Sequence, residues 1–469
     1  MKRLFGTDGI RGVAGTFPLD EATVVRIGKA LVNSLHAAAG GSPRLVIGRD
    51  TRESGPVLEA ALARGIVAAR GRVDLGGVLT TPAVACVTRL AGYDAGLVVS
   101  ASHNPYRDNG IKVFSRGGEK LSDDLEAAIE RLVLDGPGAP GAADGGARPD
   151  PPEAPGGLPP ASSAFSLGPA EIAERYLGWL LTAAGPGAPL RGFTIVLDCA
   201  NGAATALAPE LYRRAGAAVV PIHDRPDGRN INEGCGALHT EALAAEVLAR
   251  KADLGLAFDG DADRCLVVDA TGRLLDGDYV LYLTARDRKA AGRLRGDAVV
   301  GTVMSNLWLD RALQSEGIRL LRAPVGDKYV LEEMQKGGYV LGGEPSGHII
   351  FLENATTGDG LLTGLLVLDL VRRTGLDLAA WAATIRPCPQ VILNVPVRER
   401  PALDSHPTIG PAIRDEERRL GRDGRLLVRY SGTEPKARIM VEGEPRQAVE
   451  RAAARLRTII QKEIGQETS

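Results

Sequence analysis

Residues 45–78, LVIGRDTRESGPVLEAALARGIVAARGRVDLGGV, contain a short apolar run, a turn of small and polar residues, a helical pattern over 60–69 and a second apolar run from 73 to 78. This order is typical of a βαβ unit, in which a helix covers a pair of parallel strands. The same order returns in residues 193–222 and again in residues 298–323. A structural repeat of this kind predicts three related α/β domains.

The C-terminal part of the chain has a different pattern. Residues 390–398 and 425–430 read as strands, and residues 446–464 form an amphipathic helical pattern with Val449 and Leu456 on its apolar face. We predict a smaller α+β domain here. The expected fold class is therefore α/β, with three related mixed-sheet domains and one C-terminal α+β domain.

A proline-rich stretch separates the first repeat from the second. Residues 136–160 hold eight prolines and seven glycines, and Leu158 is the only large apolar side chain among them. Such a stretch cannot bury enough surface to offset its ordering entropy, so we interpret it as a linker. The predicted division is domain 1 at 1–135, the linker at 136–167, domain 2 at 168–273, domain 3 at 274–386 and domain 4 at 387–469.

Composition narrows the class of partner. The 469 residues include 56 Lys and Arg against 58 Asp and Glu, which provides no electrostatic case for nucleic acid or a membrane surface as the main partner. The five cysteines are far apart in sequence, which excludes a CxxC knuckle and argues against zinc. The chain lacks the apolar stretches of a signal peptide or a membrane span. We expect a cytoplasmic protein that acts on a small molecule.

The sequence DGDADR, residues 259–264, lies between two apolar runs. Carboxylates at Asp259, Asp261 and Asp263 in a strand-to-strand turn can converge on one hard cation. A calcium EF-hand loop is excluded because Arg264 and Ala270 stand where its glycine and glutamate are needed. Magnesium is therefore favoured, and a solvated acidic turn is the alternative.

The sequence SASHNP, residues 100–105, follows the apolar run 96–99. Its polar side chains should emerge at the carboxyl end of a buried strand, where open α/β sheets bind ligands. Ser102 beside His103 does not by itself indicate an acyl-transfer nucleophile, because the chain has no GxSxG elbow. A plain polar turn closed by Asn104 and Pro105 fits the pattern equally well.

Two further loops combine polar side chains with glycine. Ser431, Gly432 and Thr433, with Arg429 and Arg438 nearby, form a plausible phosphate cradle because arginine forks match phosphate geometry. A Ser-Gly turn is the alternative.

The second such loop, residues 343–348, follows a predicted strand at 339–341. It contains Glu344, Ser346 and His348, side chains that suit sugar hydroxyl groups. A solvent-exposed loop would have a similar composition.

Taken together, these loops resemble those of the α-D-phosphohexomutase superfamily, most closely its phosphoglucosamine mutase branch. The motifs that carry the resemblance, in chain order, are LFGTDGIRG at 4–12, SASHNPYRDNGIKVF at 100–114, DGDADR at 259–264, VGDKYVLEEM at 325–334, GGEPSGHII at 342–350, TTGDGLLTGLLVL at 356–368 and SGTEP at 431–435.

The resemblance implies four domains around a central cleft, with one signature loop per domain, and it implies a role for each predicted site residue. Ser102 would carry a phosphoryl group and, with the three aspartates, hold one Mg²⁺. His103 and Lys112 would move protons, and Arg11 and Arg264 would lie beside the transferring phosphoryl group. Substrate would be bound by Glu344, Ser346, His348, Arg429, Ser431, Gly432, Thr433 and Arg438.

The function implied is an isomerase that interconverts glucosamine 6-phosphate and glucosamine 1-phosphate for cell-wall precursors, with a hexosamine bisphosphate as intermediate and activator. Pro345 and Lys328 depart from the residues usual in the glucosamine branch, which leaves a phosphomannomutase/phosphoglucomutase as the alternative. A Mg²⁺-dependent sugar phosphatase and a non-catalytic sugar-phosphate sensor are more remote alternatives. The sequence leaves a monomer and a homodimer equally open.

Overall fold

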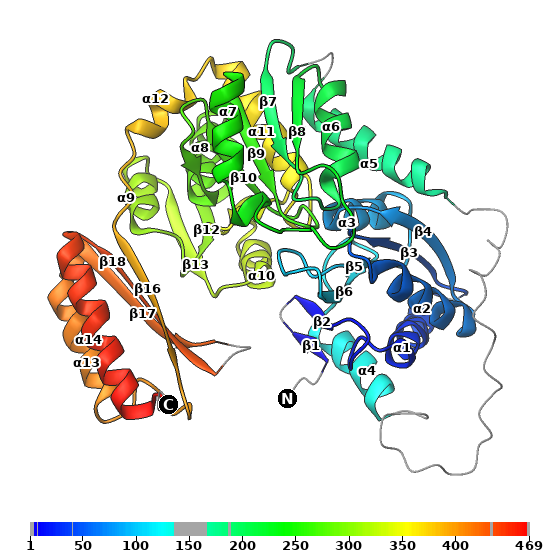
Figure 1. Cartoon of the computed structure of the whole chain (residues 1–469), viewed down its shortest axis with the longest axis horizontal. Coiled ribbons are helices and arrows are strands. Elements are labelled where there is room, and N and C mark those ends of the chain that lie inside the picture. The colour runs from blue at the N-terminus through cyan, green and yellow to red at the C-terminus, as the bar shows by residue number, and fades with distance from the viewer. Residues whose placement is uncertain are drawn as a thin grey trace.

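The computed structural model describes residues 4–6, 8–39, 41–135, 167–185, 189–431 and 435–466. These residues form four β-sheets, of which three are mixed and flanked by helices and the fourth is antiparallel (Figure 1). The predicted fold class is confirmed. Of the proposed linker, residues 136–166 lie outside the described residues.

The first sheet has the strand order β1-β2-β6-β5-β3-β4. Strands β3, β4 and β5 pair in parallel, and the first βαβ unit predicted from the sequence is β3-α2-β4. β6 runs antiparallel to β5, which makes the sheet mixed. The elements are β1 (Phe5–Gly6), β2 (Gly9–Val13), α1 (Glu21–Ala39), β3 (Arg44–Arg49), α2 (Gly55–Ala68), β4 (Arg72–Val78), α3 (Thr81–Leu90), β5 (Ala95–Val99), β6 (Asp108–Ser115) and α4 (Asp123–Leu134).

The second sheet has the order β11-β10-β9-β7-β8. The predicted βαβ unit is β7-α6-β8, and its strands are parallel. β9 and β10 form an antiparallel hairpin whose turn is the DGDADR sequence. The elements are α5 (Pro169–Ala184), β7 (Thr194–Asp198), α6 (Ala204–Arg214), β8 (Ala218–Ile222), η1 (Gly236–Leu238), α7 (Glu241–Arg250), β9 (Leu254–Phe258), β10 (Cys265–Asp269) and β11 (Leu274–Leu275).

The third sheet has the order β13-β12-β14-β15, with the predicted parallel unit β12-α9-β13. The strand expected at 339–341 lies instead at 341–343. Gly338, with a positive φ of 66°, and the bond from Tyr339 N to Met334 O end the preceding helix, so the sheet begins two residues later. The elements are α8 (Gly277–Ala290), η2 (Arg295–Asp297), β12 (Ala298–Thr302), α9 (Leu307–Ser315), β13 (Arg319–Ala323), α10 (Asp327–Gly337), β14 (Leu341–Gly343), β15 (Ile349–Phe351), α11 (Gly360–Thr374) and α12 (Leu378–Ala383).

The fourth sheet, β16-β18-β17, is antiparallel throughout. The two predicted strands and the predicted helix 446–464 are confirmed, and the structure adds the central strand β18 around Ile439. Figure 1 shows this part in orange and red, set apart from the three other sheets and joined to them by the segment that leads into β16. The elements are β16 (Gln390–Pro396), α13 (Ile409–Leu420), η3 (Gly421–Asp423), β17 (Gly424–Tyr430), β18 (Lys436–Gly443) and α14 (Arg446–Ile464).

One hydrophobic core joins the first three sheets. It contains buried residues from all three, such as Val98, Leu256 and Val299, and smaller cores lie within each of the three. The fourth sheet and its helices surround a separate core with Ile439 and Leu456. We call the described residues between 4 and 388 the three-sheet body, and those between 390 and 466 the C-terminal body.

Candidate active site

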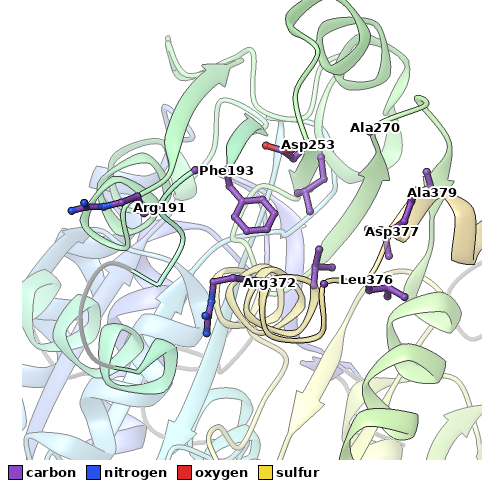
Figure 2. Close-up of a pocket in the computed structure, with 13 residues that line it drawn as sticks. Arg191, Phe193, Asp253, Ala270, Arg372, Leu376, Asp377 and Ala379 are labelled. Carbon is purple, nitrogen blue, oxygen red and sulfur yellow. The ribbon is translucent and has the colours of Figure 1, made fainter.

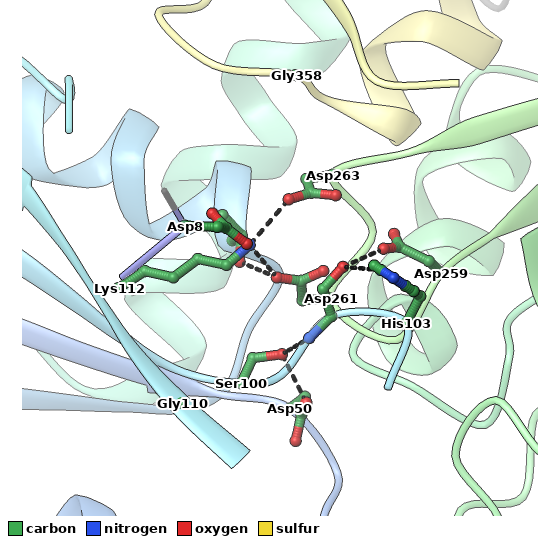
Figure 3. Close-up of polar contacts among 12 residues, drawn as sticks. Asp8, Asp50, Ser100, His103, Gly110, Lys112, Asp259, Asp261, Asp263 and Gly358 are labelled. Atoms are coloured by element: carbon green, nitrogen blue, oxygen red, sulfur yellow. Dashed lines mark hydrogen bonds and ion pairs between the residues drawn. The ribbon is translucent and has the colours of Figure 1, made fainter. Parts of the chain in front are cut away.

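Ser102 lies at the carboxyl end of β5, as the sequence predicts. Its side chain is buried and its backbone is left-handed, with a φ of 51°, a conformation that costs a non-glycine residue free energy. Ser102 N donates to Ser100 Oγ at 2.9 Å, and Ser100 Oγ donates to Asp50 Oδ2 at 2.6 Å (Figure 3). These hydrogen bonds hold Ser102 in its unusual conformation.

The carbonyl groups of this loop are held by one buried guanidinium. Arg52 is fully buried and donates to the carbonyl oxygens of Ser102 and Asn104, both at 2.9 Å, and to those of Pro105 and Asp108. Asn232, from the second sheet's part of the chain, donates to the same Ser102 oxygen at 2.8 Å. The loop is therefore fixed from both sheets.

The hairpin turn between β9 and β10 faces this loop. Ser102 Oγ donates to Asp259 Oδ2 at 2.6 Å, although the two residues are 157 positions apart (Figure 3). One carboxylate oxygen from each of Asp259, Asp261 and Asp263 lies within 4.8 Å of the others, and all three side chains are buried. The sequence placed a serine and three aspartates in separate motifs, and the structure brings them together.

This carboxylate triad has the donor set of a site for a hard cation. Asp261 Oδ1 and Asp263 Oδ1 are buried and make no hydrogen bond, which is costly for a carboxylate unless a cation is present. Burial, followed by the charges of Asp263 and Asp261, raises the pKa of Asp259 to about 8. Oxygen ligands in this number suit a cation such as Mg²⁺ or Ca²⁺, so these residues could hold a metal ion.

Lys112 enters the triad from β6. Its Nζ lies 2.9 Å from both Asp261 Oδ2 and Asp263 Oδ2 and 3.3 Å from Asp8 Oδ2. Burial acts to lower the pKa of Lys112, but the three carboxylates outweigh it and raise the pKa well above its usual range. The lysine is therefore charged and offsets part of the triad's negative charge.

Two arginines and a histidine complete the immediate surroundings of Ser102. Arg264 Nε lies 3.9 Å from both Asp259 and Asp263, and Arg11 Nη2 lies 2.5 Å from Asp8. His103 Nδ1 lies 3.3 Å from Ser102 Oγ.

Burial, followed by the charges of Arg264 and Arg11, lowers the pKa of His103 to about 4. The imidazole beside the serine hydroxyl is therefore neutral at pH 7.

The loop predicted to bind sugar hydroxyls lies between β14 and β15. Ser346 Oγ is buried without a hydrogen-bond partner, and Glu344 Oε1 accepts from Gly326 N at 3.1 Å. His348 is buried: its Nε2 accepts from Gly358 N at 2.9 Å and its Nδ1 lies 3.7 Å from Asp263. Both nitrogen atoms thus face protein groups, and the histidine connects this loop to the triad.

The predicted phosphate cradle belongs to the C-terminal body. Arg429 and Arg438 are register partners in β17 and β18, and Arg438 Nη2 donates to Ser431 Oγ at 3.3 Å. Burial, followed by the charge of Arg438, lowers the pKa of Arg429, as expected for adjacent cations that an anion would stabilise. Gly432 and Thr433 lie outside the described residues.

Comparison with known proteins identifies the family. Successive parts of the chain match the four domains described as phosphoglucomutase/phosphomannomutase: alpha/beta/alpha domain I at residues 2–137, domain II at 185–272, domain III at 276–387 and the C-terminal domain at 392–459. The chain belongs to the phosphoglucomutase/phosphomannomutase family. The resemblance found in the sequence is confirmed, and the chain is a phosphohexomutase, an isomerase.

Individual relatives agree with this family along nearly the whole chain. The phosphoglucosamine mutase of Solibacter usitatus is 47% identical over 468 residues, covering 99% of this chain and 100% of the relative. That of Symbiobacterium thermophilum is 46% identical, covering 99% of this chain and 100% of the relative.

Solved structures show the same fold. A phosphoglucomutase/phosphomannomutase family protein from Burkholderia thailandensis has a TM-score of 0.76 at 25% identity, with 98% of each chain covered. The Aspergillus fumigatus N-acetylphosphoglucosamine mutase, solved with GlcNAc-6P and magnesium, has a TM-score of 0.65 at 19% identity and covers 98% of this chain and 96% of its own.

Cavity volume alone would not locate the site of this phosphohexomutase. A cavity of about 520 Å³ lies where the second and third sheets' parts meet, and it is lined by Phe193, Asp253, Arg372 and Leu376 among others (Figure 2). None of the site residues predicted from the sequence lines it. The polar groups around Ser102, not the volume of a pocket, mark the candidate active site.

Several residues of the phosphohexomutase site escaped the sequence analysis. Asp50 and Arg52 follow β3, and the carboxyl end of β3 lies beside that of β5. Open α/β sheets bind ligands at the carboxyl ends of their strands, so the argument that indicated Ser102 could also have indicated these two residues. No strand end or turn pattern indicated Asp8 or Asn232. Asp8 lies in the LFGTDGIRG motif at 4–12, and Asn232 lies in none of the motifs that carry the resemblance. In the parts of the chain that the structure describes, no helix is both long and apolar enough to cross a lipid bilayer.

Proposed function

We propose that this phosphohexomutase interconverts glucosamine 6-phosphate and glucosamine 1-phosphate through a phosphoserine at Ser102 and a hexosamine bisphosphate intermediate. The observation that carries the proposal is the 2.6 Å contact between Ser102 Oγ and Asp259 at the buried carboxylate triad. The phosphoglucosamine mutases that share 46–47% of their residues with this chain support the choice of an amino sugar.

One Mg²⁺ per active site would be held by Ser102, Asp259, Asp261 and Asp263, whose oxygen donors suit this hard cation. Bound there, Mg²⁺ would neutralise charge that develops on the transferring phosphoryl group. Phosphoryl transfer depends mainly on placement and charge stabilisation, which explains why the serine is held so firmly.

The proposed reaction consists of two phosphoryl transfers at one hydroxyl group. The C1 oxygen of glucosamine 6-phosphate attacks the phosphoserine phosphorus, the bond from phosphorus to Ser102 Oγ breaks, and the C1 hydroxyl loses its proton. The bisphosphate then reverses its orientation, and Ser102 Oγ attacks the phosphorus at C6 as the serine hydroxyl loses its proton. The bond from that phosphorus to the C6 oxygen breaks and the C6 oxygen takes up a proton, which releases glucosamine 1-phosphate and restores the phosphoserine. The bisphosphate also acts as the activator, because it can load an unphosphorylated serine.

The charged side chains around Ser102 have distinct parts in this proposal. His103 is neutral at pH 7, since its pKa is about 4, and a neutral imidazole can accept a proton. Lys112 is charged and can donate a proton. Arg11 and Arg264 would lie beside the transferring phosphoryl group and stabilise its charge.

Substrate would be held at both ends. Glu344, Ser346 and His348 would face the sugar, and the buried, unpartnered hydroxyl of Ser346 supports this assignment. Arg429, Ser431 and Arg438, with Gly432 and Thr433, would bind the phosphate that is not reacting. The proposed domains are residues 1–135, 168–273, 274–386 and 387–469, each with one of these loops. The proposal applies to a monomer or a homodimer in the cytoplasm.

A phosphomannomutase/phosphoglucomutase is the second candidate. Lys328, which stands where the glucosamine branch commonly has arginine, forms an ion pair with Asp123 at 2.7 Å. Pro345 lies in the sugar loop itself. Neither residue is among those assigned to the phosphoryl transfer, so we expect them to bear on specificity.

Turnover of three substrates tests the proposal. Glucosamine 1-phosphate, mannose 1-phosphate and glucose 1-phosphate are compared with Mg²⁺ and catalytic hexose bisphosphate present. We expect the highest kcat/KM on glucosamine 1-phosphate. A preference for mannose or glucose phosphate would establish the second candidate, release of inorganic phosphate as the main product would indicate a phosphatase, and binding without turnover would indicate a sensor.

A further inference from the structure

A second group of potential metal ligands lies outside the site of phosphoryl transfer. Asp198 is the last residue of β7, His223 follows the last residue of β8, and Cys235 precedes η1. β7 and β8 are parallel neighbours, so their carboxyl ends meet at one edge of the sheet. One ligand atom from each of the three residues lies within 4.8 Å of the others.

His223 faces the carboxylate of Asp198. Its Nδ1 lies 3.0 Å from Asp198 Oδ2, within hydrogen-bond distance. A cation bound among the three ligand atoms would take the place of the proton that this pair shares, because an imidazole ligates a metal in its neutral form. The backbone of His223 is left-handed, with a φ of 46°, a conformation that costs a non-glycine residue free energy.

The other two residues also keep donor capacity. Each carboxylate oxygen of Asp198 accepts one backbone N–H, from Ala200 and from Gly236, both at 2.9 Å, so each has a lone pair left. Cys235 is completely buried, and its sulfur accepts one long hydrogen bond, from Asn201 Nδ2 at 3.9 Å, so lone pairs remain. The nearby carboxylates of Asp224 and Glu233 add negative potential on this side of the sheet.

We infer that Asp198, His223 and Cys235 form a binding site for a borderline-soft divalent cation of the zinc class. A thiolate, an imidazole and a carboxylate are the ligands that Zn²⁺ and Co²⁺ prefer, whereas Mg²⁺ prefers oxygen alone. The side chain of His223 is 30% exposed, so a fourth ligand could come from solvent. The chain would then hold two chemically distinct cation sites, and the inference does not depend on the proposed sugar specificity.

The position of the site suggests what an ion would do there. Asn201 N donates to His223 O at 2.7 Å, and Asn232 N donates to Ala200 O at 3.0 Å. Asn232 in turn holds the Ser102 carbonyl. A cation would therefore fix residues 223–236 against β7 and stabilise one of the two supports of the Ser102 loop.

Cobalt binding tests the inference on the full chain. The protein is stripped with a chelator, saturated with Mg²⁺ and titrated with Co²⁺, and the absorption spectrum is recorded. We expect one equivalent of Co²⁺ to produce a thiolate-to-cobalt charge-transfer band and the intense visible bands of tetrahedral Co²⁺, because carboxylates alone give neither. Zn²⁺ should abolish both and raise the midpoint of thermal unfolding.

Variants identify the ligands. Cys235→Ser should lose the charge-transfer band, and His223→Ala should weaken Co²⁺ binding by at least about tenfold. Two control variants should keep the band. Cys388→Ser shows that another thiol is not the ligand, and Asp261→Asn shows that the carboxylate triad is not the site. Circular dichroism and the unfolding midpoint establish that each variant is folded, and His223→Ala provides the test if Cys235→Ser does not fold. No band in the wild-type protein, or a band that persists in folded Cys235→Ser, would overturn the inference.

Discussion

The three-sheet body and the C-terminal body differ in how they are held together. The first three sheets share one continuous hydrophobic core, and polar contacts cross between their parts, such as Ser102 to Asp259 and Lys120 to Asp327. The C-terminal body has its own core. Among the described residues it meets the rest through contacts such as Arg425 Nη2 to Ser305 O at 3.0 Å and Arg311 Nη2 to Arg422 O at 3.5 Å.

This difference matches two chemical tasks. Phosphoryl transfer requires the serine, the carboxylates and the cations to keep fixed positions, and a shared core provides this. The phosphate that is not reacting changes places with the reacting one, so its binding residues must accept two orientations of the sugar. A body with a separate core and few contacts can adjust its position, and we expect it to move on ligand binding. Solution scattering with and without substrate would reveal this movement, and identical profiles would contradict it.

The largest effect is expected from Ser102→Ala in the three-sheet body. Without the hydroxyl group that carries the phosphoryl group, mutase activity should fall by at least about a thousandfold. The variant should also take up no stable phosphate label from hexose bisphosphate. Ser405→Ala, an exposed serine of the C-terminal body, is the matched control and should keep wild-type activity. Normal turnover by Ser102→Ala would remove the proposed nucleophile.

Two cavity-creating substitutions test whether the bodies are stabilised independently. Leu256→Ala removes buried groups from the shared core, and Leu456→Ala does so in the C-terminal core; each should cost about 2–5 kcal/mol of local stability. Hydrogen exchange should show faster opening of β9 and β5 in the first variant, and of β18 and α14 alone in the second. If Leu456→Ala also exposes β5, the two bodies unfold as one unit.

Loss of phosphate binding in the C-terminal body should change KM more than kcat. Arg438→Ala removes one charged hydrogen-bond donor, worth about 1.5–3 kcal/mol, so KM should rise roughly 10- to 100-fold. Steady-state kinetics on glucosamine 1-phosphate measure the effect. Arg446→Ala, a mostly exposed arginine of the same body, should leave KM unchanged. An equal or greater fall in kcat would place Arg438 with the transfer machinery instead.

The smallest effect is expected in the pH dependence of the unfolding free energy, at Asp359 beside the shared core. Asp359 is the N-cap of α11. It accepts from Leu362 N at 3.0 Å, and the Tyr176 hydroxyl lies 2.9 Å from both of its carboxylate oxygens. Burial raises the pKa of Asp359 to about 6. Between the ordinary pKa of aspartate, near 4, and this raised value, the folded state holds a proton that the unfolded chain has lost. Stability should therefore fall as the pH rises from about 4 to 6, by roughly 1–3 kcal/mol.

Asp359→Asn keeps the cap and removes the titration. The difference in unfolding free energy between wild type and this variant, measured by urea unfolding, should change over that pH range and then level off. A difference that is constant from pH 4 to 7 would show that Asp359 does not titrate as its burial indicates.

Much of this architecture was predictable because its signals are local. The three βαβ units, the strand before Ser102 and the acidic hairpin at 259–264 follow from apolar runs and turn residues within a few positions of one another. The missed strand β18 and the shifted β14 are errors of the same local kind. Ser102 and Asp259, by contrast, were paired only through the family resemblance, since no local pattern joins residues 157 positions apart.

Local patterns also do not tell which distant residues meet. The wide spacing of the cysteines argued against zinc, and only the structure shows that Cys235, just before η1, lies within reach of Asp198 and His223 at the ends of β7 and β8. Arg52 offered no sign that it would be buried under four carbonyl groups. In both cases the environment comes from elements that pack together after the chain has folded.

The sequence by itself determined the kinds of elements, the chemistry of each loop and the membership of the family. Only the tertiary structure decided which loops share a site. Helix α5 packs against α3 and α11, and this packing places one sheet beside the next and so brings their loops together. Such packing buries side chains from distant parts of the chain together, and periodicity and turn residues act over too few positions to specify it.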